Sequence, residues 1–156
     1  MSKLENIEKC RQKVVSSINK FGFSPEHNYF NYFYKQTPGK KCFFLDFGRK
    51  RGVIAIFNSR NGVWSAVDGI LAPRNERVEV FLKFVDHVLS RKNSRKISVE
   101  AEEEFKAEAF KALRNSKYKA SMNYSLHWPV VDLQKLDENL KGKEWKKFRN
   151  IRNRFH

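Results

Sequence analysis

Three apolar segments separated by two tight turns constrain the fold of this chain most strongly. Residues 42–47, 53–57 and 63–71 are rich in β-branched and aromatic side chains, which favour strands. The loops between them, residues 48–52 and 58–62, are short and contain glycine, as hairpin turns do. The sequence therefore predicts a three-stranded antiparallel meander.

Helical patterns surround this meander. Apolar residues recur every three or four positions before, between and after the strands, which is typical of amphipathic helices. The predicted helices cover residues 2–20, 29–34, 75–91 and 102–114, with Gly22 placed to end the first and Asn75 placed to cap the third. Two further strands are expected over 96–100 and 120–131. The predicted fold is α/β (α+β), a mixed sheet flanked by helices.

The net charge of +15, from 32 Lys and Arg against 17 Asp and Glu, favours a polyanionic partner. Nucleic acid, an anionic membrane surface and a phosphorylated cofactor all fit this charge. The alternative is a solvated surface that serves solubility alone. No segment has the roughly 20 consecutive apolar residues that a membrane-spanning helix requires.

The two cysteines, Cys10 and Cys42, lie far apart among apolar neighbours and are predicted to be buried free thiols. The four histidines have no spacing that would complete a zinc site with them, so no metal is expected. Reduced thiols and the absence of an apolar signal segment at the start indicate a cytoplasmic protein.

The last third of the chain carries a distinctive motif. Residues 122–133, MNYSLHWPVVDL, precede residues 140–155, LKGKEWKKFRNIRNRF. This combination resembles the GNAT-like domain of phosphatidylglycerol lysyltransferases and related Fem-type aminoacyltransferases, in which a strand ending in Asp-Leu is followed by a basic helix. The order of predicted elements matches the same GNAT layout.

The resemblance implies a single GNAT-like domain over 1–156, with 133–156 as a basic connecting helix. Because the family domain continues into a second GNAT-like half, this chain is expected to be a first half that is incomplete or inactive alone. It would then pair with such a half or with a second copy of itself. The implied activity is acyl or aminoacyl transfer from aminoacyl-tRNA.

The predicted polyanion-binding residues come from two places. In the last helix, apolar residues at 145, 148, 151 and 155 would pack inward and leave the cations outside, where they can neutralise phosphates. The tip of the first hairpin can extend this patch. The residues are Lys143, Lys146, Lys147, Arg149, Arg152 and Arg154 in the helix, and Arg49, Lys50 and Arg51 in the hairpin. The alternative is a solvated connector helix.

A GNAT enzyme that uses acetyl-CoA binds the pyrophosphate at the start of the helix after the meander. Here Arg74 and Arg77 are candidate cofactor-binding residues, but no glycine falls in the turn and Pro73 removes a donor. No cofactor is therefore expected, and both arginines are expected to be solvated.

No catalytic pair is predicted. Asp68 could serve as a general base at the end of the third strand, and His127 could touch a substrate, but each has a simple structural interpretation as well. Two alternatives to aminoacyl transfer remain: a non-catalytic RNA- or anion-binding module, and an acyl-CoA N-acetyltransferase.

Overall fold

A computed structural model describes residues 3–23, 27–67, 69–114, 116–122, 141–143, 145–146 and 149–150. The chain divides into two compact units, residues 1–120 and 121–156, and each is treated by itself. The sheet and its helices all belong to the first unit. A single domain over the whole length stays a prediction.

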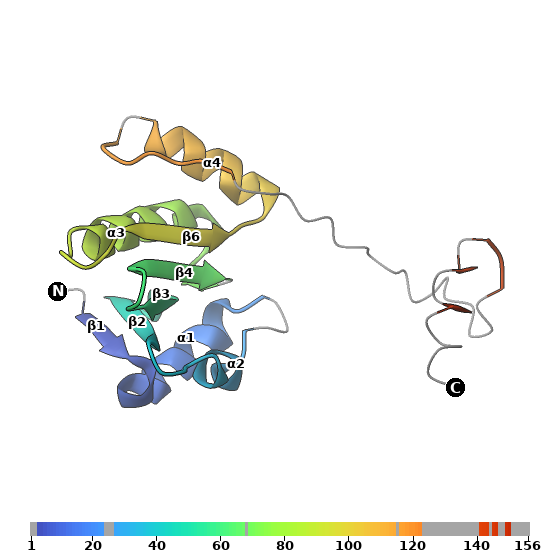
Figure 1. The fold of residues 1–156 in the computed structure, drawn as a ribbon, viewed down its shortest axis with the longest axis horizontal. Coiled ribbons are helices and arrows are strands. Elements are labelled where there is room, and N and C mark those ends of the chain that lie inside the picture. Colours follow the sequence, from blue (N-terminus) through green and yellow to red (C-terminus); the bar gives the residue numbers. More distant parts are fainter. Residues whose placement is uncertain are drawn as a thin grey trace. The chain divides into compact units, whose positions relative to one another are not determined.

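The first unit contains a six-stranded mixed sheet flanked by helices (Figure 1). The strand order is β1-β2-β3-β4-β6, with β5 paired to β3 beside this path. The strands are β1 (Lys3–Asn6), β2 (Lys40–Gly48), β3 (Arg51–Asn58), β4 (Val63–Val67), β5 (Ile70–Leu71) and β6 (Lys96–Glu100). The predicted fold class, a mixed α/β sheet flanked by helices, is confirmed.

The meander is confirmed, with a tighter first turn than the sequence suggested. Strand β2 pairs antiparallel with β3, and β3 with β4. Only Arg49 and Lys50 connect β2 to β3, and their φ angles are 53° and 65°. Positive φ at both central residues is typical of the type I′ hairpin turn, whose twist matches that of the strands. The turn therefore holds two bulky cations in a conformation that L-residues adopt at a cost.

The prediction of one helix over 2–20 is wrong at its beginning. Residues Lys3–Asn6 form the edge strand β1, which pairs antiparallel with β2 so that Leu4 lies opposite Leu45. A 3-10 turn (η1, Ile7–Cys10) follows, capped by the Asn6 side chain, which accepts from the Glu8 amide at 2.9 Å. The helix α1 then runs over Arg11–Phe21, and Gly22 ends it as predicted. Pairing with β2 outweighs the local helical pattern because it places Leu4 against the core.

Helix α3 also begins later than predicted. A 3-10 turn (η2, Arg74–Glu76) precedes it, α3 spans Arg77–Leu89, and Asn75 does not cap it. The strand β6 that follows pairs parallel with β4, from Val63 opposite Lys96 to Val67 opposite Glu100. The remaining helices agree with their predictions to within a residue: α2 covers Tyr29–Tyr34 and α4 covers Glu103–Leu113. The expected strand over 120–131 lies almost entirely outside the described residues.

The core has two parts, one on each face of the sheet. On one face, Trp64 and Phe84 pack with α3 and α4; on the other, Ile7, Val14 and Phe44 pack with α1 and α2. Side chains of β2 and β3 alternate between the two parts, as strand geometry requires. Burial on both faces explains why these strands read as continuous apolar runs. None of the described helices has the length and apolarity needed to cross a bilayer.

We expect the double substitution Arg49→Asn with Lys50→Gly to stabilise the protein. Asn-Gly is the preferred pair for a type I′ turn, and relief of the positive φ angles is worth about 1 kcal/mol. Urea unfolding followed by circular dichroism measures the change. The double substitution Arg49→Val with Lys50→Val serves as the control. It should destabilise the protein, because β-branched residues resist positive φ.

Both cysteines are buried and free, as predicted. Burial raises the pKa of the Cys42 thiol from 9.0 to about 12 and that of Cys10 to about 11. Because the folded state holds these protons more tightly than the unfolded state, the stability they contribute is complete below pH 9. It is lost as the pH rises toward 11 and 12.

We therefore expect wild-type protein to lose about 1 kcal/mol more stability than Cys42→Ala between pH 8 and pH 10. Urea unfolding of the two proteins at both pH values measures the difference. Other alkaline groups titrate in both proteins and cancel in the comparison. Equal losses would mean that the Cys42 thiol ionises normally in the folded protein.

Candidate functional site

The third strand of the meander, β4, is interrupted at its end. Ser65 and Ile70 are five residues apart, while their partners in β3, Ile56 and Val53, are three apart. The extra residues form a bulge, a feature that often occurs beside binding sites. The backbone at Gly69 is pressed against β3: the Ile54 amide donates to the Gly69 carbonyl at 2.7 Å, and a Cβ at Gly69 would lie 1.9 Å from the Ile54 oxygen. Only glycine fits here.

After this bulge, the chain no longer pairs with β6. The parallel ladder between β4 and β6 ends at Val67 and Glu100, and β5 beyond it pairs with β3. Because Ile54 and Gly69 form a hydrogen-bonded pair, the next pair, Val53 and Ile70, is a non-hydrogen-bonded one. The peptide N–H and C=O of Ile70 therefore point away from β3. They face the side of the sheet on which β6 pairs with β4 but not with β5.

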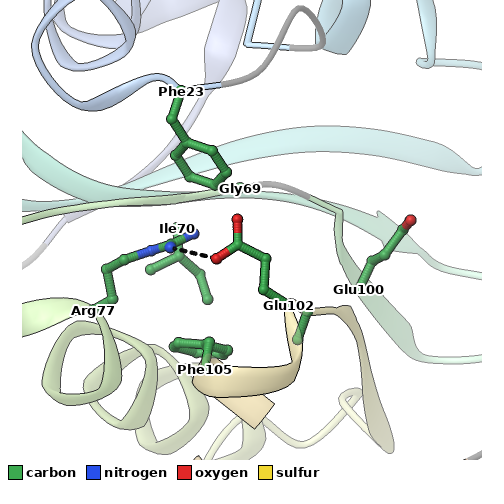
Figure 2. Close-up of a pocket in the computed structure, with 8 residues that line it drawn as sticks. Phe23, Gly69, Ile70, Arg77, Glu100, Glu102 and Phe105 are labelled. Carbon is green, nitrogen blue, oxygen red and sulfur yellow. Dashed lines mark ion pairs between the residues drawn. The ribbon is translucent and has the colours of Figure 1, made fainter. Parts of the chain in front are cut away.

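A small pocket lies where the two strands part (Figure 2). The empty space among its lining atoms, open solvent included, is about 280 Å³, and little of it is enclosed. In open α/β sheets, ligands bind outside the carboxyl ends of parallel strands, and this pocket lies at the carboxyl ends of β4 and β6. The lining residues are Phe23, Gly69, Ile70, Arg77, Glu100, Ala101, Glu102 and Phe105.

Arg77 is the central charged residue of the pocket. Its guanidinium carbon lies 4.3 Å from the centroid of the Phe23 ring and 5.6 Å from that of Phe105. A guanidinium nitrogen lies 3.5 Å from a Glu102 carboxylate oxygen (Figure 2). The side chain of Arg77 is only 15% exposed, and its buried Nε has no hydrogen-bond partner among the described residues. The expectation that Arg77 is solvated is therefore wrong; two aromatic rings and a carboxylate enclose it.

The carboxylates of the pocket have different surroundings. Glu102 is paired with Arg77, whereas Glu100, the last residue of β6, is exposed and has no hydrogen bond or ion pair to any described residue. An exposed carboxylate beside an apolar pocket can bind an ammonium group and accept its proton. Asp68, the base candidate from the sequence, lies outside the described residues, as does His127.

The other sequence-predicted residues are dispersed. Arg74 is 77% exposed, as expected, and forms an ion pair with Glu104. In the hairpin, Arg49 and Lys50 are exposed, but Arg51 forms an ion pair with Glu76 and is only 24% exposed. Their binding roles stay predictions.

The predicted basic helix belongs to the second unit and is described in part. Lys146 and Arg149 are helical, and the Arg149 amide donates to the Trp145 carbonyl at 2.9 Å. The Arg149 guanidinium also donates to the Gly142 carbonyl at 2.7 Å. Lys143 precedes this turn, and Lys147, Arg152 and Arg154 lie outside the described residues.

Most of the residues that line the pocket were not predicted from the sequence. Phe23, Glu102 and Phe105 come from the end of α1 and the start of α4, segments that read as an ordinary helix end and an acidic first turn. The one available signal was Gly69 inside an apolar strand, since glycine there often marks a bulge. Among the described residues, no group of three or more potential ligands could hold a metal ion.

Comparison with known proteins gives little beyond the fold. No family model matches the chain, and no curated protein matches it. Among solved structures, glucosamine-6-phosphate N-acetyltransferase from Arabidopsis thaliana is similar at a TM-score of 0.39 and 13% sequence identity. The match covers 80% of this chain and 98% of that one.

We expect Arg77→Met to destabilise the protein by about 1–2 kcal/mol. Methionine keeps the aliphatic contacts but removes the cation–π and ion-pair interactions, which are worth most where water is excluded. Arg74→Met is the matched control, because the exposed Arg74–Glu104 pair is worth little. Thermal and urea unfolding measure the stability of both variants. Similar losses of stability in the two would contradict a special role for Arg77.

Proposed function

We propose that this chain is a GNAT-like domain related to aminoacyltransferases and that its pocket holds an aminoacyl ester during transfer to an amine. The ester is that of an aminoacyl-tRNA. Support for the donor comes from the motif over residues 122–155 and from the net charge of +15. Support for the location comes from the pocket at the carboxyl ends of β4 and β6.

The observation that carries the proposal is the orientation of the Ile70 peptide group. Ile70 is only 4% exposed and lines the pocket, yet its N–H and C=O lie outside the ladder with β3. Buried peptide groups require partners. An ester carbonyl that accepts from the Ile70 N–H would satisfy this donor and would be polarised for attack, as in an oxyanion hole.

The proton transfers fall to Glu100 at the pocket. Its carboxylate takes a proton from the ammonium form of the acceptor, and the free amine attacks the ester carbonyl carbon. Glu100 releases this first proton to solvent. As the new C–N bond forms and the C–O bond to the ribose breaks, the attacking nitrogen loses a second proton, which Glu100 passes to the ribose oxygen. Arg77 and Glu102 neutralise each other and act as a wall of the pocket.

An acyl-CoA donor fits this geometry less well. A pyrophosphate at the start of α3 would need free cations and amide donors. There, Arg77 pairs with Glu102 and Arg74 pairs with Glu104, while Pro73 has no amide hydrogen. Carboxylates already occupy the positions around both arginines.

Binding of an amide-linked 3′-aminoacyl adenosine, a stable mimic of the ester, tests the proposal. We expect this mimic to raise the melting temperature of the full chain, and acetyl-CoA to leave it unchanged. Ile70→Pro removes the N–H that faces the pocket, together with part of the buried side chain, and proline is tolerated where that N–H is outside the ladder. This variant should bind the mimic about tenfold more weakly.

Ile70→Val keeps the N–H and serves as the matched control; it should bind the mimic as the wild type does. Stabilisation by acetyl-CoA but not by the mimic would overturn the choice of donor and select an N-acetyltransferase. If neither ligand stabilises the protein, the pocket has no part in its function.

A non-catalytic RNA- or anion-binding module is the second candidate, and the charge of +15 favours it. This module needs no chemistry at the pocket. Retained tRNA binding, together with no transfer to any amine by a single-turnover assay, would select it.

A further inference from the structure

Three turns meet at the end of the sheet opposite the pocket. They are residues 37–41, which lead into the first residues of β2, residues 58–62, from the end of β3 to β4, and residues 90–96, from α3 to the first residue of β6. The Ser59 amide donates to the Gly39 carbonyl at 2.9 Å, and the Arg95 amide donates to the Gly62 carbonyl at 2.8 Å. Because β4 and β6 run in the same direction (Figure 1), these turns surround their amino ends.

These turns carry only one sign of charge. None of the three segments contains Asp or Glu, all of their residues are described, and every cation in them is exposed. We call this surface the cationic end. Its residues are Lys40, Lys41, Arg60, Arg91, Lys92, Arg95 and Lys96.

No carboxylate among the described residues neutralises the cationic end, since none of its cations takes part in an ion pair there. Two acids of adjoining elements have other partners. Asp86 accepts from the Tyr118 hydroxyl at 2.8 Å and lies 3.9 Å from the Lys117 ammonium nitrogen. Glu8 accepts from the Gln36 amide at 2.8 Å.

Packing brings these side chains close together. Arg60 lies against Gly39 in the neighbouring turn, where its Nε would be 3.0 Å from an added Cβ, and Arg95 lies against Gly62 in the same way. Exposed like charges repel one another wherever they lie within a Debye length, about 8 Å at physiological salt. A polyanion that bridges the three turns would relieve this repulsion.

The composition of the turns favours a nucleic acid over a membrane. Phosphodiester groups are bound by Lys and Arg together with Ser and Asn side chains and amide groups, and the same turns contain Ser59, Asn61 and Asn93. A peripheral membrane site needs apolar side chains that insert among the lipids. No large hydrophobic residue of these three described segments is exposed.

We propose that the cationic end binds the phosphodiester backbone of a nucleic acid, without reading base sequence. The strands β4 and β6 have five residues each, so this surface lies roughly 16 Å from the pocket at 3.3 Å per residue. A nucleic acid can therefore contact the cationic end while the pocket stays open. This binding does not depend on the function proposed for the pocket.

Two variants of equal net charge test this surface. The first replaces Arg60, Lys92, Arg95 and Lys96 with Gln. The control replaces Lys9, Lys111, Arg114 and Lys119 with Gln, four other exposed cations that take part in no ion pair among the described residues. Each variant keeps a net charge of +11 from the original +15, and circular dichroism checks that both are folded.

Fluorescence anisotropy with labelled RNA and DNA, single-stranded and duplex, at 50–200 mM salt measures affinity. We expect the first variant to bind about 10²-fold more weakly at 100 mM salt and to show a salt slope smaller by about 3. The control should change less than about threefold and keep its slope. Whichever nucleic acid binds most tightly in the wild type identifies the form of the partner.

Three outcomes overturn the proposal. Equal losses in both variants would show that the affinity comes from net charge and not from this surface. If the wild type binds none of these nucleic acids, a nucleic acid is not the partner of this surface. Vesicles of phosphatidylserine that bind the wild type more tightly than every nucleic acid, with loss only in the first variant, would assign the surface to a membrane. Binding of the aminoacyl mimic is measured separately, so either proposal can fail alone.

Discussion

The close approach of Gly69 to the backbone of β3 determines the shape of this domain at the end that holds the pocket. A single Cβ at position 69 would collide with the Ile54 carbonyl, so the bulge exists only because glycine stands there. The bulge shifts the register of the chain, sends β5 back to β3 and leaves β6 without a partner beyond Glu100. The pocket, the free peptide group of Ile70 and the position of Arg77 all follow from that shift.

The two cores make this arrangement rigid. Trp64 packs among Phe43, Phe57 and Phe84 on one face of the sheet, and its indole N–H donates to the Ser94 hydroxyl at 2.8 Å. That hydrogen bond ties the beginning of β4 to the turn before β6. On the other face, α1 and α2 cover β2 and β3. The amino end of the parallel pair is thus held by a side-chain hydrogen bond and not by surface charges.

The sequence predicted the meander, the helices and strand β6 because their patterns are local. Alternation, glycine turns and apolar stripes are visible within ten or fifteen residues. Pairing is not local: Lys3–Asn6 reads as helix and becomes strand only because β2 offers an edge. The parallel partner of β6 was likewise not evident from residues 96–100 alone.

The site was less predictable than the fold, for the same reason. Arg77 looked like a solvated cation, and only the folded chain brings Phe23 and Phe105 to its two sides. The basic residues that the sequence predicted to bind a polyanion lie close together in the chain, at 49–51 and 143–154. The cationic end escaped notice because its residues are spread over three separate turns between residues 37 and 96. Density along the sequence is a poor guide to density on a surface.

The parallel pairing of β4 and β6 has a consequence for how such a domain can change over time. Turn residues collect at one end of the pair and the bulge at the other, with buried strand between them. Surface loops tolerate substitution and insertion far better than buried strands do. Partner choice can therefore drift through the turns while the geometry around Gly69 remains under separate selection.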